Sequence, residues 1–359
     1  MAASLPLVDL HASDPSADAL AREQALVDWL RARRRVLVGF SGGVDSAYLA
    51  VVAVDTLGPA HVLAVIGRSA SYPAAQWRAA RDVAEAFAVP VLEVDTDEMN
   101  DPRYAANPTN RCYFCKSELW GRLAPVAAEH GFETIVDGTN ADDLHDHRPG
   151  ARAAAEQGVA SPLADAGLTK ADIRALSRRR GLPTWAQPSS PCLSSRIPYG
   201  TSVTPERLAR VERAERALRE AGIAGDLRVR HHGDLARIEV VPDALTRMLA
   251  EPPLRDAVHA AGYDRVAVDL RGFRSGSLNV LGGVRADGPP IPAEPDAAAL
   301  AARMLELGIA CTVERVERLA VLSGVGLASR LGEATLREEV LAVARASGFT
   351  HAAVALAPA

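Results

Sequence analysis

A turn rich in serine and glycine carries the clearest chemical signal in the sequence. The apolar run 36–40 is followed directly by Ser41–Ser46, which reads Ser-Gly-Gly-Val-Asp-Ser. Glycines lack a Cβ and let several backbone N–H groups converge on one point, and the helix expected from Val44 to Leu57 brings its positive end to the same place. The two serines add hydroxyl donors. These features predict a phosphate-binding loop, but not a Walker A loop, because the turn contains no lysine.

Three cysteines form a second group of residues suited to chemistry. Cys112 and Cys115 have the Cys-x-x-Cys spacing of metal ligands in a stretch of Asn, Pro and Thr residues, where we expect a loop, and Cys192 follows in a second loop. Zinc, an iron–sulfur cluster and a redox disulfide all fit, with unrelated reduced thiols as the alternative. Three cysteines suit a [4Fe–4S] cluster with one open iron, whereas zinc usually needs a fourth ligand. The candidates for that ligand are His130, His145 and His147.

The composition narrows the class of protein. The chain has 359 residues, 48% of them hydrophobic, a net charge of −5 and a pI near 6.0. This length predicts two or three domains, and the charge balance argues against a general nucleic-acid-binding surface. The sequence has no run of about 18 apolar residues and no basic N-terminal segment, so we expect a cytoplasmic protein without a membrane span or secretory signal. Cysteines in that compartment indicate metal binding or catalysis rather than disulfides.

Strands and helices that alternate along the chain must position these residues. The predicted strands are 36–40, 61–66, 91–95 and 134–137, and the predicted helices are 17–34, 44–57, 74–87, 116–130 and 168–180. This alternation predicts an α/β fold with a Rossmann-like parallel sheet, in which ligands bind at the carboxyl ends of the strands. Three polar stretches fall at such ends: Ser41–Ser46, residues 67–69 and residues 137–140.

A proline-rich segment at 187–200 divides the chain. We predict a nucleotide-binding domain over 17–185, a smaller α/β domain for substrate binding and oligomerisation over 186–281, a linker over 282–295 and a degenerate repeat of the second domain over 296–359. The repeat rests on three pairs of similar segments, 82 to 86 residues apart: 221–224 with 307–310, 254–258 with 336–340, and 261–270 with 347–356. Each copy is predicted to run helix, strand, strand, helix, strand.

The two copies differ in their charged residues. The first carries Arg228, Arg230, His231, His232 and Asp234 around its strand pair. The second carries Glu314, Arg315, Glu317 and Arg318, which we expect to pair among themselves on a solvated face. We therefore predict that the second copy is structural, covering a sheet edge or contributing an oligomer contact. Its cysteine, Cys311, is predicted to be a buried thiol.

Seven motifs together resemble the LarE family of ATP-dependent sulfur transferases, which belongs to the PP-loop ATP pyrophosphatases. The motifs are Ser41–Ser46, residues 107–116 with Cys112 and Cys115, residues 137–143, residues 148–150, residues 191–200 with Cys192, residues 228–232 and residues 274–279. The resemblance implies a Rossmann-like PP-loop domain joined to a smaller C-terminal α/β domain. Residues 282–359 lie outside the resemblance, as an extra half-duplicated module.

The resemblance implies a reaction in which ATP activates a carboxylate. The substrate would be pyridinium-3,5-biscarboxylic acid mononucleotide: one carboxylate is adenylated, pyrophosphate leaves, and sulfur insertion gives a thiocarboxylate and AMP, in biosynthesis of the nickel-pincer nucleotide cofactor. One branch of the family sacrifices the sulfur of a single cysteine, and another carries a [4Fe–4S] cluster whose open iron delivers sulfide. The three cysteines resemble the second branch, and Cys192, at the sacrificial position, provides the fallback.

The resemblance also implies roles for individual residues. The ATP site would consist of Ser41, Gly42, Gly43, Asp45, Ser46, Arg68, Gly138 and Thr139, with Asp45 on Mg²⁺ directly or through water. The [4Fe–4S] cluster would be held by Cys112, Cys115 and Cys192, and these three and Asp45 are the predicted catalytic residues. The substrate phosphate and carboxylates would be bound by Arg196, Arg228 and Arg230, with His232 in support. Candidate polar partners of these arginines are Glu215 and Glu239.

The predicted partners are the pyridinium mononucleotide and sulfide or another sulfur source, with no nucleic acid and no membrane, and we expect a homo-oligomer. Two alternatives stay open. A PP-loop tRNA thiolase would need a basic RNA-binding surface or an appended module, against which the net charge of −5 argues. A nucleotide-binding regulatory protein without catalysis would tolerate a decayed site, whereas the Ser41–Ser46 loop and all three cysteines are intact.

Overall fold

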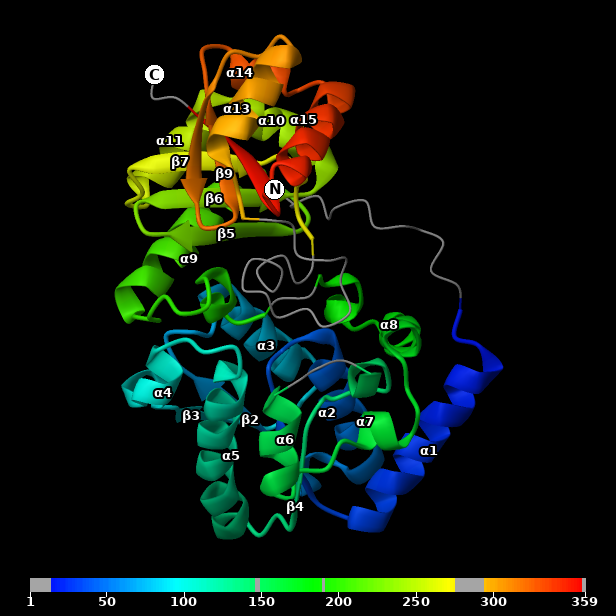
Figure 1. The fold of residues 1–359 in the computed structure, drawn as a ribbon. Coiled ribbons are helices and arrows are strands. Elements are labelled where there is room, and N and C mark those ends of the chain that lie inside the picture. The colour runs from blue at the N-terminus through cyan, green and yellow to red at the C-terminus, as the bar shows by residue number, and fades with distance from the viewer. Residues whose placement is uncertain (1–13, 146–148, 189–190, 275–293, 357–359) are drawn as a thin grey trace. The chain divides into compact units, whose positions relative to one another are not determined.

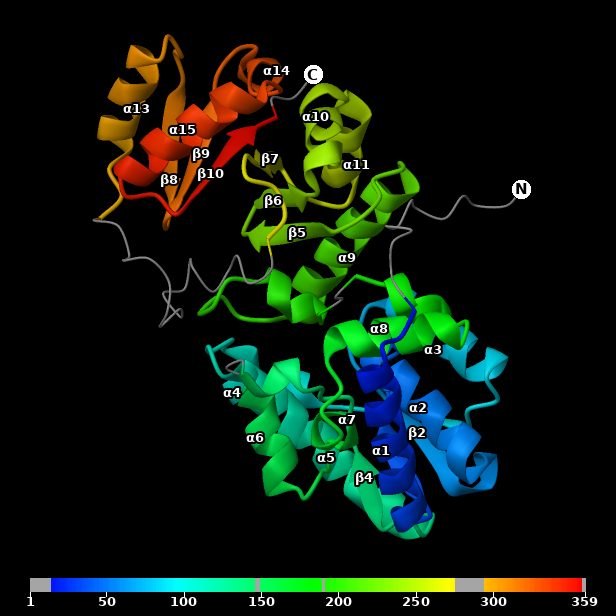
Figure 2. The ribbon, with the colours of Figure 1, turned by 90° about the vertical axis from the view of Figure 1, so that its right-hand side faces the viewer.

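The computed structural model describes residues 14–145, 149–188, 191–274 and 294–356. The chain forms two compact units, Met1–Cys192 and Leu193–Ala359, each with its own sheet and its own core (Figures 1 and 2). The first unit contains the predicted phosphate loop and three of the four cysteines, and the second contains both copies of the predicted repeat.

Four parallel strands form the sheet of the first unit. They lie in the order β3-β2-β1-β4, with bounds β1 Val36–Gly39, β2 Val62–Arg68, β3 Val91–Asp95 and β4 Thr134–Val136. The three apolar residues of β1 are buried, as expected for a strand with neighbours on both sides and helices over both faces. The strand order reverses between β1 and β4, so the carboxyl ends of these two strands define the switch point at which such sheets bind ligands.

Helices cover both faces of this sheet (Figure 1). One face packs against α1 (Ala17–Arg33), α2 (Val44–Leu57), α3 (Ala74–Ala86) and α8 (Lys170–Arg179), and the other against α5 (Arg111–Glu129) and α6 (Pro149–Glu156). The unit also contains the short helices α4 (Pro102–Ala105) and α7 (Pro162–Asp165). The predicted α/β fold with a parallel sheet is confirmed.

Two local predictions in this unit are wrong. Helix α5 begins at Arg111, so Cys112 and Cys115 lie in its first turns and not in a loop. The helix starts early because the breaker Pro108 stands just before it, and Arg111 N donates to Pro108 O at 3.0 Å. Helix α6 begins at Pro149, where the pattern predicts no helix, because proline is well suited to a first helical turn.

The second unit contains one six-stranded sheet, in the order β5-β6-β7-β10-β9-β8, to which both copies contribute. The first copy supplies α9 (Pro205–Glu220), β5 (Leu227–His232), β6 (Leu235–Val240), α10 (Pro242–Ala250), α11 (Pro252–Ala260) and β7 (Arg265–Asp269). The second supplies α13 (Ala297–Glu306), β8 (Thr312–Val316), β9 (Leu319–Ser323), α14 (Leu327–Arg330), α15 (Ala334–Ala346) and β10 (His351–Ala355). Both copies have the predicted element order, with the second helix split in two. Most of the predicted linker lies outside the described residues.

The two copies meet in a symmetric register. Strands β7 and β10 pair antiparallel, with Val268 opposite Val354 and Ala267 opposite Ala355. Val268 and Val354 are 86 residues apart, which is the spacing of the repeat, so equivalent positions face each other at the centre of the junction. The second copy therefore covers the edge of β7, which is one of the two roles predicted for it, in the register that a two-fold dimer would have.

Candidate active site

The loop after β1 has the form expected of a phosphate cradle. Gly42 has a φ of +66°, and a Cβ on it would lie 2.4 Å from the Cβ of Ala80, so the position requires glycine. The carbonyl oxygen of Ser41 accepts hydrogen bonds from the Tyr72 hydroxyl at 2.9 Å and from the Gln76 amide at 2.8 Å. These contacts fix the start of the loop against α3.

Helix α2 leaves this loop without a side-chain cap. Its N-cap is Gly43, which makes no side-chain hydrogen bond to the first turn, so N–H groups of that turn are available to a ligand. The Ser46 hydroxyl lies within the loop, where it accepts a hydrogen bond from Ser41 N at 3.2 Å and lies 3.1 Å from the Ser41 hydroxyl. The loop is thus a set of donors at the positive end of a helix, which suits an anion such as pyrophosphate.

The end of β4 packs directly on this loop. A Cβ on Gly138 would lie 2.9 Å from Ser46 N, so glycine permits the close approach of two backbone segments. The carboxylate of Asp137 orients Thr139, accepting hydrogen bonds from its backbone N–H at 3.0 Å and from its hydroxyl at 2.8 Å. The structure therefore brings Gly138 and Thr139, both predicted ATP ligands, to the loop at the switch point between β1 and β4.

Asp45, the predicted Mg²⁺ contact, is paired with a residue that the sequence analysis leaves unassigned. Lys170, at the start of α8, forms an ion pair with Asp45, and Asn140 Nδ2 donates to Asp45 Oδ1 at 3.4 Å. The sequence does contain a signal for a special role of Lys170, because Lys116 and Lys170 are the only two lysines among 40 basic residues. A compact ammonium acts as a point charge toward phosphate, which the broad guanidinium of arginine does not reproduce.

Arg68 lies at another part of the sheet edge. Its guanidinium, with 49% of the side chain exposed, donates to Asp95 at 2.9 and 3.0 Å and to Glu93 at 3.1 Å. The hydrogen bond to Asp95 is the main reason that the pKa of Arg68 is raised. The structure thus places this predicted ATP ligand at the end of β2, beside β3, and its role in ATP binding stays a prediction.

The three predicted cluster ligands lie in the first unit, and Cys112 and Cys192 both act on the Cys115 thiol. Cys112 and Cys115 are three residues apart on α5 and share one side of the helix, and Cys192 ends the unit. Burial, Glu98, Cys192 and Cys112 raise the pKa of the Cys115 thiol far above its usual range, and Lys116 opposes the shift only in part. The surroundings of Cys115 thus favour its neutral thiol over the thiolate.

The three cysteines and the predicted histidines are the candidate ligands of a metal ion or a cluster. Within the described ranges, no group of three or more His, Cys, Asp or Glu side chains is arranged to hold one ion. A [4Fe–4S] cluster on Cys112, Cys115 and Cys192 stays a prediction. His130 caps the far end of α5, about 27 Å from the first turn at 1.5 Å per residue, so it cannot complete a zinc site. His147 and the side chain of His145 lie outside the described residues.

A buried glutamate connects the cysteines with the phosphate loop. Glu98, in the short helix η2 (Glu98–Asn100), is 2% exposed and accepts a hydrogen bond from the Ser71 hydroxyl at 3.2 Å. The next residue, Tyr72, donates to the Ser41 carbonyl of the loop. Since Glu98 also acts on the Cys115 thiol, the two predicted centres of this unit are joined by neighbouring side chains. Glu98 cannot be recognised from local sequence patterns, because its neighbours lie far from it along the chain.

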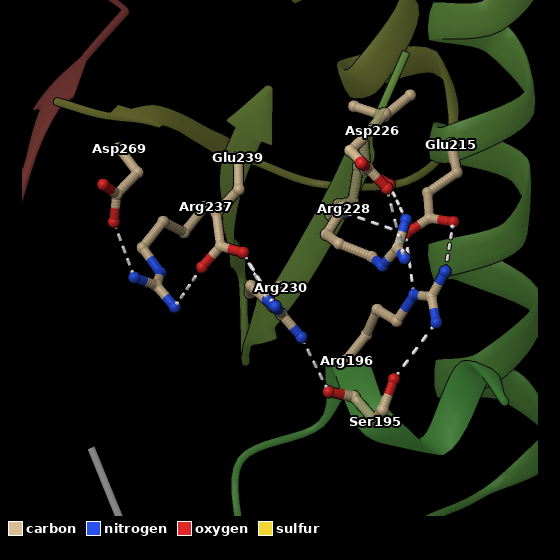
Figure 3. A network of polar contacts seen from close by, with 11 residues as sticks. Ser195, Arg196, Glu215, Asp226, Arg228, Arg230, Arg237, Glu239 and Asp269 are labelled. Carbon is tan, nitrogen blue, oxygen red and sulfur yellow. Dashed lines mark hydrogen bonds and ion pairs between the residues drawn. The ribbon is translucent and has the colours of Figure 1, made fainter. Parts of the chain in front are cut away.

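In the second unit, an ion network occupies one face of the sheet (Figure 3). Arg196, in the short helix η5 (Leu193–Arg196), binds Glu215 of α9 through two hydrogen bonds of 2.9 and 3.0 Å. Arg230 binds Glu239 through hydrogen bonds of 2.7 and 3.0 Å and donates to the Ser195 carbonyl at 2.9 Å. Both glutamates are thus confirmed as partners of the predicted arginines.

The network extends to two residues that the sequence analysis does not single out. Arg237, fully buried on β6, donates to Asp269 Oδ2 at 2.7 Å and lies 3.0 Å from Glu239 Oε1. Alternate residues of a strand point to opposite faces, and Ala236, Ile238 and Val240 of β6 belong to the core under the helices. The strand residues of the network therefore lie on the face that the helices do not cover, whereas Glu215 comes from α9 and Arg196 from η5.

Buried positive charge exceeds buried negative charge in this network. The arginines are Arg196, Arg228, Arg230 and Arg237, each at most 5% exposed, and the carboxylates are Glu215, Glu239 and Asp269. Burial and then Arg196 lower the pKa of Arg228 to about 10, and burial holds the pKa of His232 well below its usual range. Asp226, whose side chain is 29% exposed, lies 3.8 Å from Arg228, so the excess of positive charge exists only among the fully buried groups. Such an excess favours an anionic ligand. The structure thus brings together all four predicted substrate residues of this unit.

The charged residues of the second copy do not pair as predicted. Glu314 pairs with Arg265 of the first copy and Arg315 with Glu294, so these two side chains find their ionic partners outside the predicted set. The shared sheet is the reason, because it brings Arg265 within reach of β8. Within the set, Arg315 Nε donates to the Glu317 carbonyl at 3.0 Å. Cys311 is partly buried, and burial raises the pKa of its thiol.

Comparison with known proteins identifies the family. A family model described as NAD synthase matches residues 24–113, which contain the phosphate loop. The pyridinium-3,5-bisthiocarboxylic acid mononucleotide synthase of Lactiplantibacillus plantarum is 35% identical over 259 residues, which make up 72% of this chain and 94% of that protein. The chain belongs to the LarE family.

Two further relatives of this LarE-family chain are uncharacterised. They are slr1717 of Synechocystis, 44% identical over 248 residues, and MJ0830 of Methanocaldococcus jannaschii, 26% identical over 246 residues. Each match covers 92% of the relative but only 68% or 67% of this chain, so the LarE-family chain described here is longer than either. Among its described residues, no helix has the length and apolar character needed to cross a membrane.

Proposed function

We propose that this chain uses ATP to activate a carboxylate of pyridinium-3,5-biscarboxylic acid mononucleotide and then inserts sulfur, giving a thiocarboxylate for nickel-pincer nucleotide biosynthesis. One observation carries the proposal: an intact predicted pyrophosphate loop and the three cysteines lie in one unit, and Tyr72, Ser71 and Glu98 connect the loop with Cys115. A transferase that spends ATP to accept sulfur needs both centres together. The L. plantarum relative is named for a bisthiocarboxylic acid product of this kind.

The first step is attack of a substrate carboxylate oxygen on the α-phosphorus of ATP, with pyrophosphate leaving. The Ser41–Ser46 loop would stabilise the leaving group, because its donors are already positioned when charge develops. Mg²⁺ bound through Asp45 would neutralise further phosphate charge. For this, Lys170 turns from Asp45 toward a phosphate, and Asn140 keeps the carboxylate in place. Arg68 is also proposed to bind ATP. To do so, its side chain would have to break its hydrogen bonds to Asp95.

The second step delivers sulfur to the activated carbonyl carbon. A [4Fe–4S] cluster on Cys112, Cys115 and Cys192 would supply sulfide from its open iron. The three thiols belong to one unit, and the buried Glu98 lies near enough to Cys115 to act on its thiol. In the fallback, Cys192 Sγ bonds to the carbonyl carbon and AMP leaves. The Cβ–Sγ bond then breaks with loss of the Cα proton, leaving dehydroalanine.

The ion network of the second unit would bind the phosphate and carboxylates of the substrate. Arg196 and Arg230 are held in fixed orientations by their glutamate partners, which limits the entropy lost on binding. Arg228 lies over the Phe273 ring at 4.9 Å, so stacking holds its guanidinium as well. His232, neutral because it is buried, would add a polar contact without further positive charge.

Anaerobic incubation of the full chain with ATP, Mg²⁺, sulfide and the mononucleotide tests the proposal. We expect AMP, pyrophosphate and a product whose mass reflects exchange of one oxygen for sulfur, and sacrifice of Cys192 would appear as a protein lighter by one H₂S. Asp45→Asn should abolish pyrophosphate release without changing the circular dichroism spectrum. Unchanged pyrophosphate release, or thiolation of tRNA in place of the mononucleotide, would contradict the proposal.

Reconstitution with iron and sulfide tests the sulfur source separately. We expect a broad visible absorption band in the wild-type chain and in Cys311→Ala, which removes the one cysteine outside the proposed site. The band should disappear in Cys112→Ala. Tightly bound zinc with no uptake of iron would refute the cluster while leaving the adenylation step untouched.

A further inference from the structure

The second copy contributes a buried histidine to the charged face of the sheet. His351 begins β10 and is 3% exposed, and two residues further along, Ala353 lies opposite Asp269 of β7. Residues two apart on a strand share a face, so His351 lies diagonally across from Asp269. Asp269 is the hydrogen-bond partner of Arg237 at 2.7 Å, which places His351 beside the ion network.

The two ring nitrogens of His351 have different surroundings. Nδ1 lies 3.0 Å from the Thr350 hydroxyl, and that hydroxyl donates to the Arg318 carbonyl at 3.2 Å, so the proton of the neutral ring is on Nδ1. Nε2 is buried and has no hydrogen-bond partner in the described part of the chain. Buried polar atoms without a partner are rare and mark places where water or a ligand binds.

Other buried polar atoms near His351 also lack a hydrogen-bond partner in the described part of the chain. The Nε atoms of Arg237 and Arg274 and Nε2 of His232 are buried and have no hydrogen-bond partner among the described residues. Burial, followed by Arg237, Arg274, Arg271 and His232, lowers the pKa of His351 well below its usual range. The facing carboxylates, Asp269 and Glu239, are already engaged by Arg237. The ring is therefore neutral, in a place where positive charge is uncompensated.

We propose that His351, Arg237 and Arg274 form an anion subsite for a phosphate or carboxylate group, and that His351 takes up a proton when the anion binds. An anion offsets the repulsion between the arginines and an imidazolium, so Nε2 changes from an unused acceptor to a donor. The inference rests on the proposed function only for the identity of the ligand, which would be the mononucleotide. The second copy then supplies a residue of the site in addition to covering an edge.

Calorimetric titration of the full chain measures affinity and proton uptake together, when it is run near neutral pH in two buffers of different ionisation enthalpy. The probes are inorganic phosphate and, separately, the mononucleotide. We expect binding by the wild-type chain with uptake of protons. His351→Leu should weaken binding about ten-fold, as for loss of one charge-assisted hydrogen bond, and abolish the uptake. His351→Gln, which keeps a polar group but cannot be protonated, should recover affinity without proton uptake.

His259→Leu is the matched control. His259 also has Nδ1 bonded, to the Tyr263 carbonyl at 2.8 Å, and a buried Nε2 without a partner in the described chain, but it lies on α11. Its replacement should leave phosphate binding and proton uptake unchanged.

The outcomes separate this inference from the proposed function. Equal affinity and equal proton uptake in the wild-type chain and in His351→Leu would overturn the inference and leave the proposed function standing. Thiolation of the mononucleotide by a chain that does not bind phosphate would have the same consequence. Phosphate binding with uptake that depends on His351, but without binding of the mononucleotide, would uphold the inference and overturn the function.

Discussion

The two copies in the second unit share one topology but differ on the sheet face away from the helices. Their hairpins can be matched, because β5 and β6 close with His232 opposite Leu235, and β8 and β9 close with Val316 opposite Leu319. In this match, Arg230, Arg237, Glu239 and Asp269 of the first copy correspond to Glu314, Val321, Ser323 and Ala355 of the second. The charged row of one copy is thus replaced in the other.

The face under the helices shows the opposite trend. Matching positions there are apolar in both copies and belong to one core: Ala236 and Ala320, Ile238 and Leu322, Val268 and Val354. On the outer face, an apolar cluster takes over where the ion network ends: Leu235, Ala267, Leu319, Val321 and Ala353. The difference teaches that the helix-packed face specifies the fold, while the outer face can carry either charges or apolar groups.

Removal of Glu239 should reveal the largest difference between the two copies in the free energy of unfolding. Glu239→Ala leaves Arg230 and Arg237 buried without their shared carboxylate, so the free energy of unfolding should fall by about 3–5 kcal/mol. Ser323→Ala, at the matching position, should change it by less than about 0.5 kcal/mol. Urea denaturation followed by circular dichroism measures both variants. Equal losses would mean that the two outer faces contribute alike.

A fall in pH should lower the stability of the first copy through protonation of His231. Burial, then Arg207 and Arg210, lower the pKa of His231 from 6.5 to about 4. The unfolded chain therefore binds the proton more readily, and stability present above pH 6.5 is lost as the pH falls toward 4, by about 2–3 kcal/mol. Arg315, the matching residue, stays charged throughout. His231→Phe should flatten the pH dependence of urea unfolding in this window, and an unchanged slope would rule His231 out as its source.

Truncation at the junction should affect both copies equally. Val268 and Val354 are fully buried and face each other, so Val268→Ala and Val354→Ala should each lower the free energy of unfolding by about 2 kcal/mol. Because the residues face each other, the double variant should lose less than the sum. A difference above about 1 kcal/mol between the single variants would contradict a symmetric junction.

The ion pair between the copies should have the smallest effect. The side chains of Arg265 and Glu314 are 38% and 49% exposed, so solvent screens their attraction. A double-mutant cycle with alanine at both positions should give a coupling energy below about 1 kcal/mol that decreases with added salt. A larger coupling that resists salt would mean that charge, and not the shared core, joins the copies.

Local patterns were sufficient to predict the frame of the first unit. The predicted bounds of the helix Val44–Leu57 and the strand Val91–Asp95 agree with the structure, because apolar spacing and turn residues lie within the segments themselves. The phosphate loop was equally accessible, since Ser41–Ser46 and its helix are contiguous. The start of α5 was missed because its first turn carries Cys112 and Cys115 instead of an apolar pattern.

Residues whose roles depend on distant contacts could not be predicted. Lys170 and its partner Asp45 are 125 residues apart, and Arg237 and Asp269 are 32 apart, so no local spacing connects them. The same holds for Glu98 and Cys115, which come together only when η2 and α5 fold into one unit. The buried position of Arg237 also contradicts the expectation that arginines lie at the surface.

The register of β7 and β10 changes how the two copies stay together. Two separate subunits paired in this way would part on dilution, whereas a tether keeps their effective concentration constant. A pair of identical subunits must also carry every substitution twice, once on each side of the axis. In a single chain, each copy can be substituted independently. Arg265 in β7 and His351 in β10 therefore occupy equivalent positions but are different residues. The two equivalent strands thus begin with residues of different chemistry.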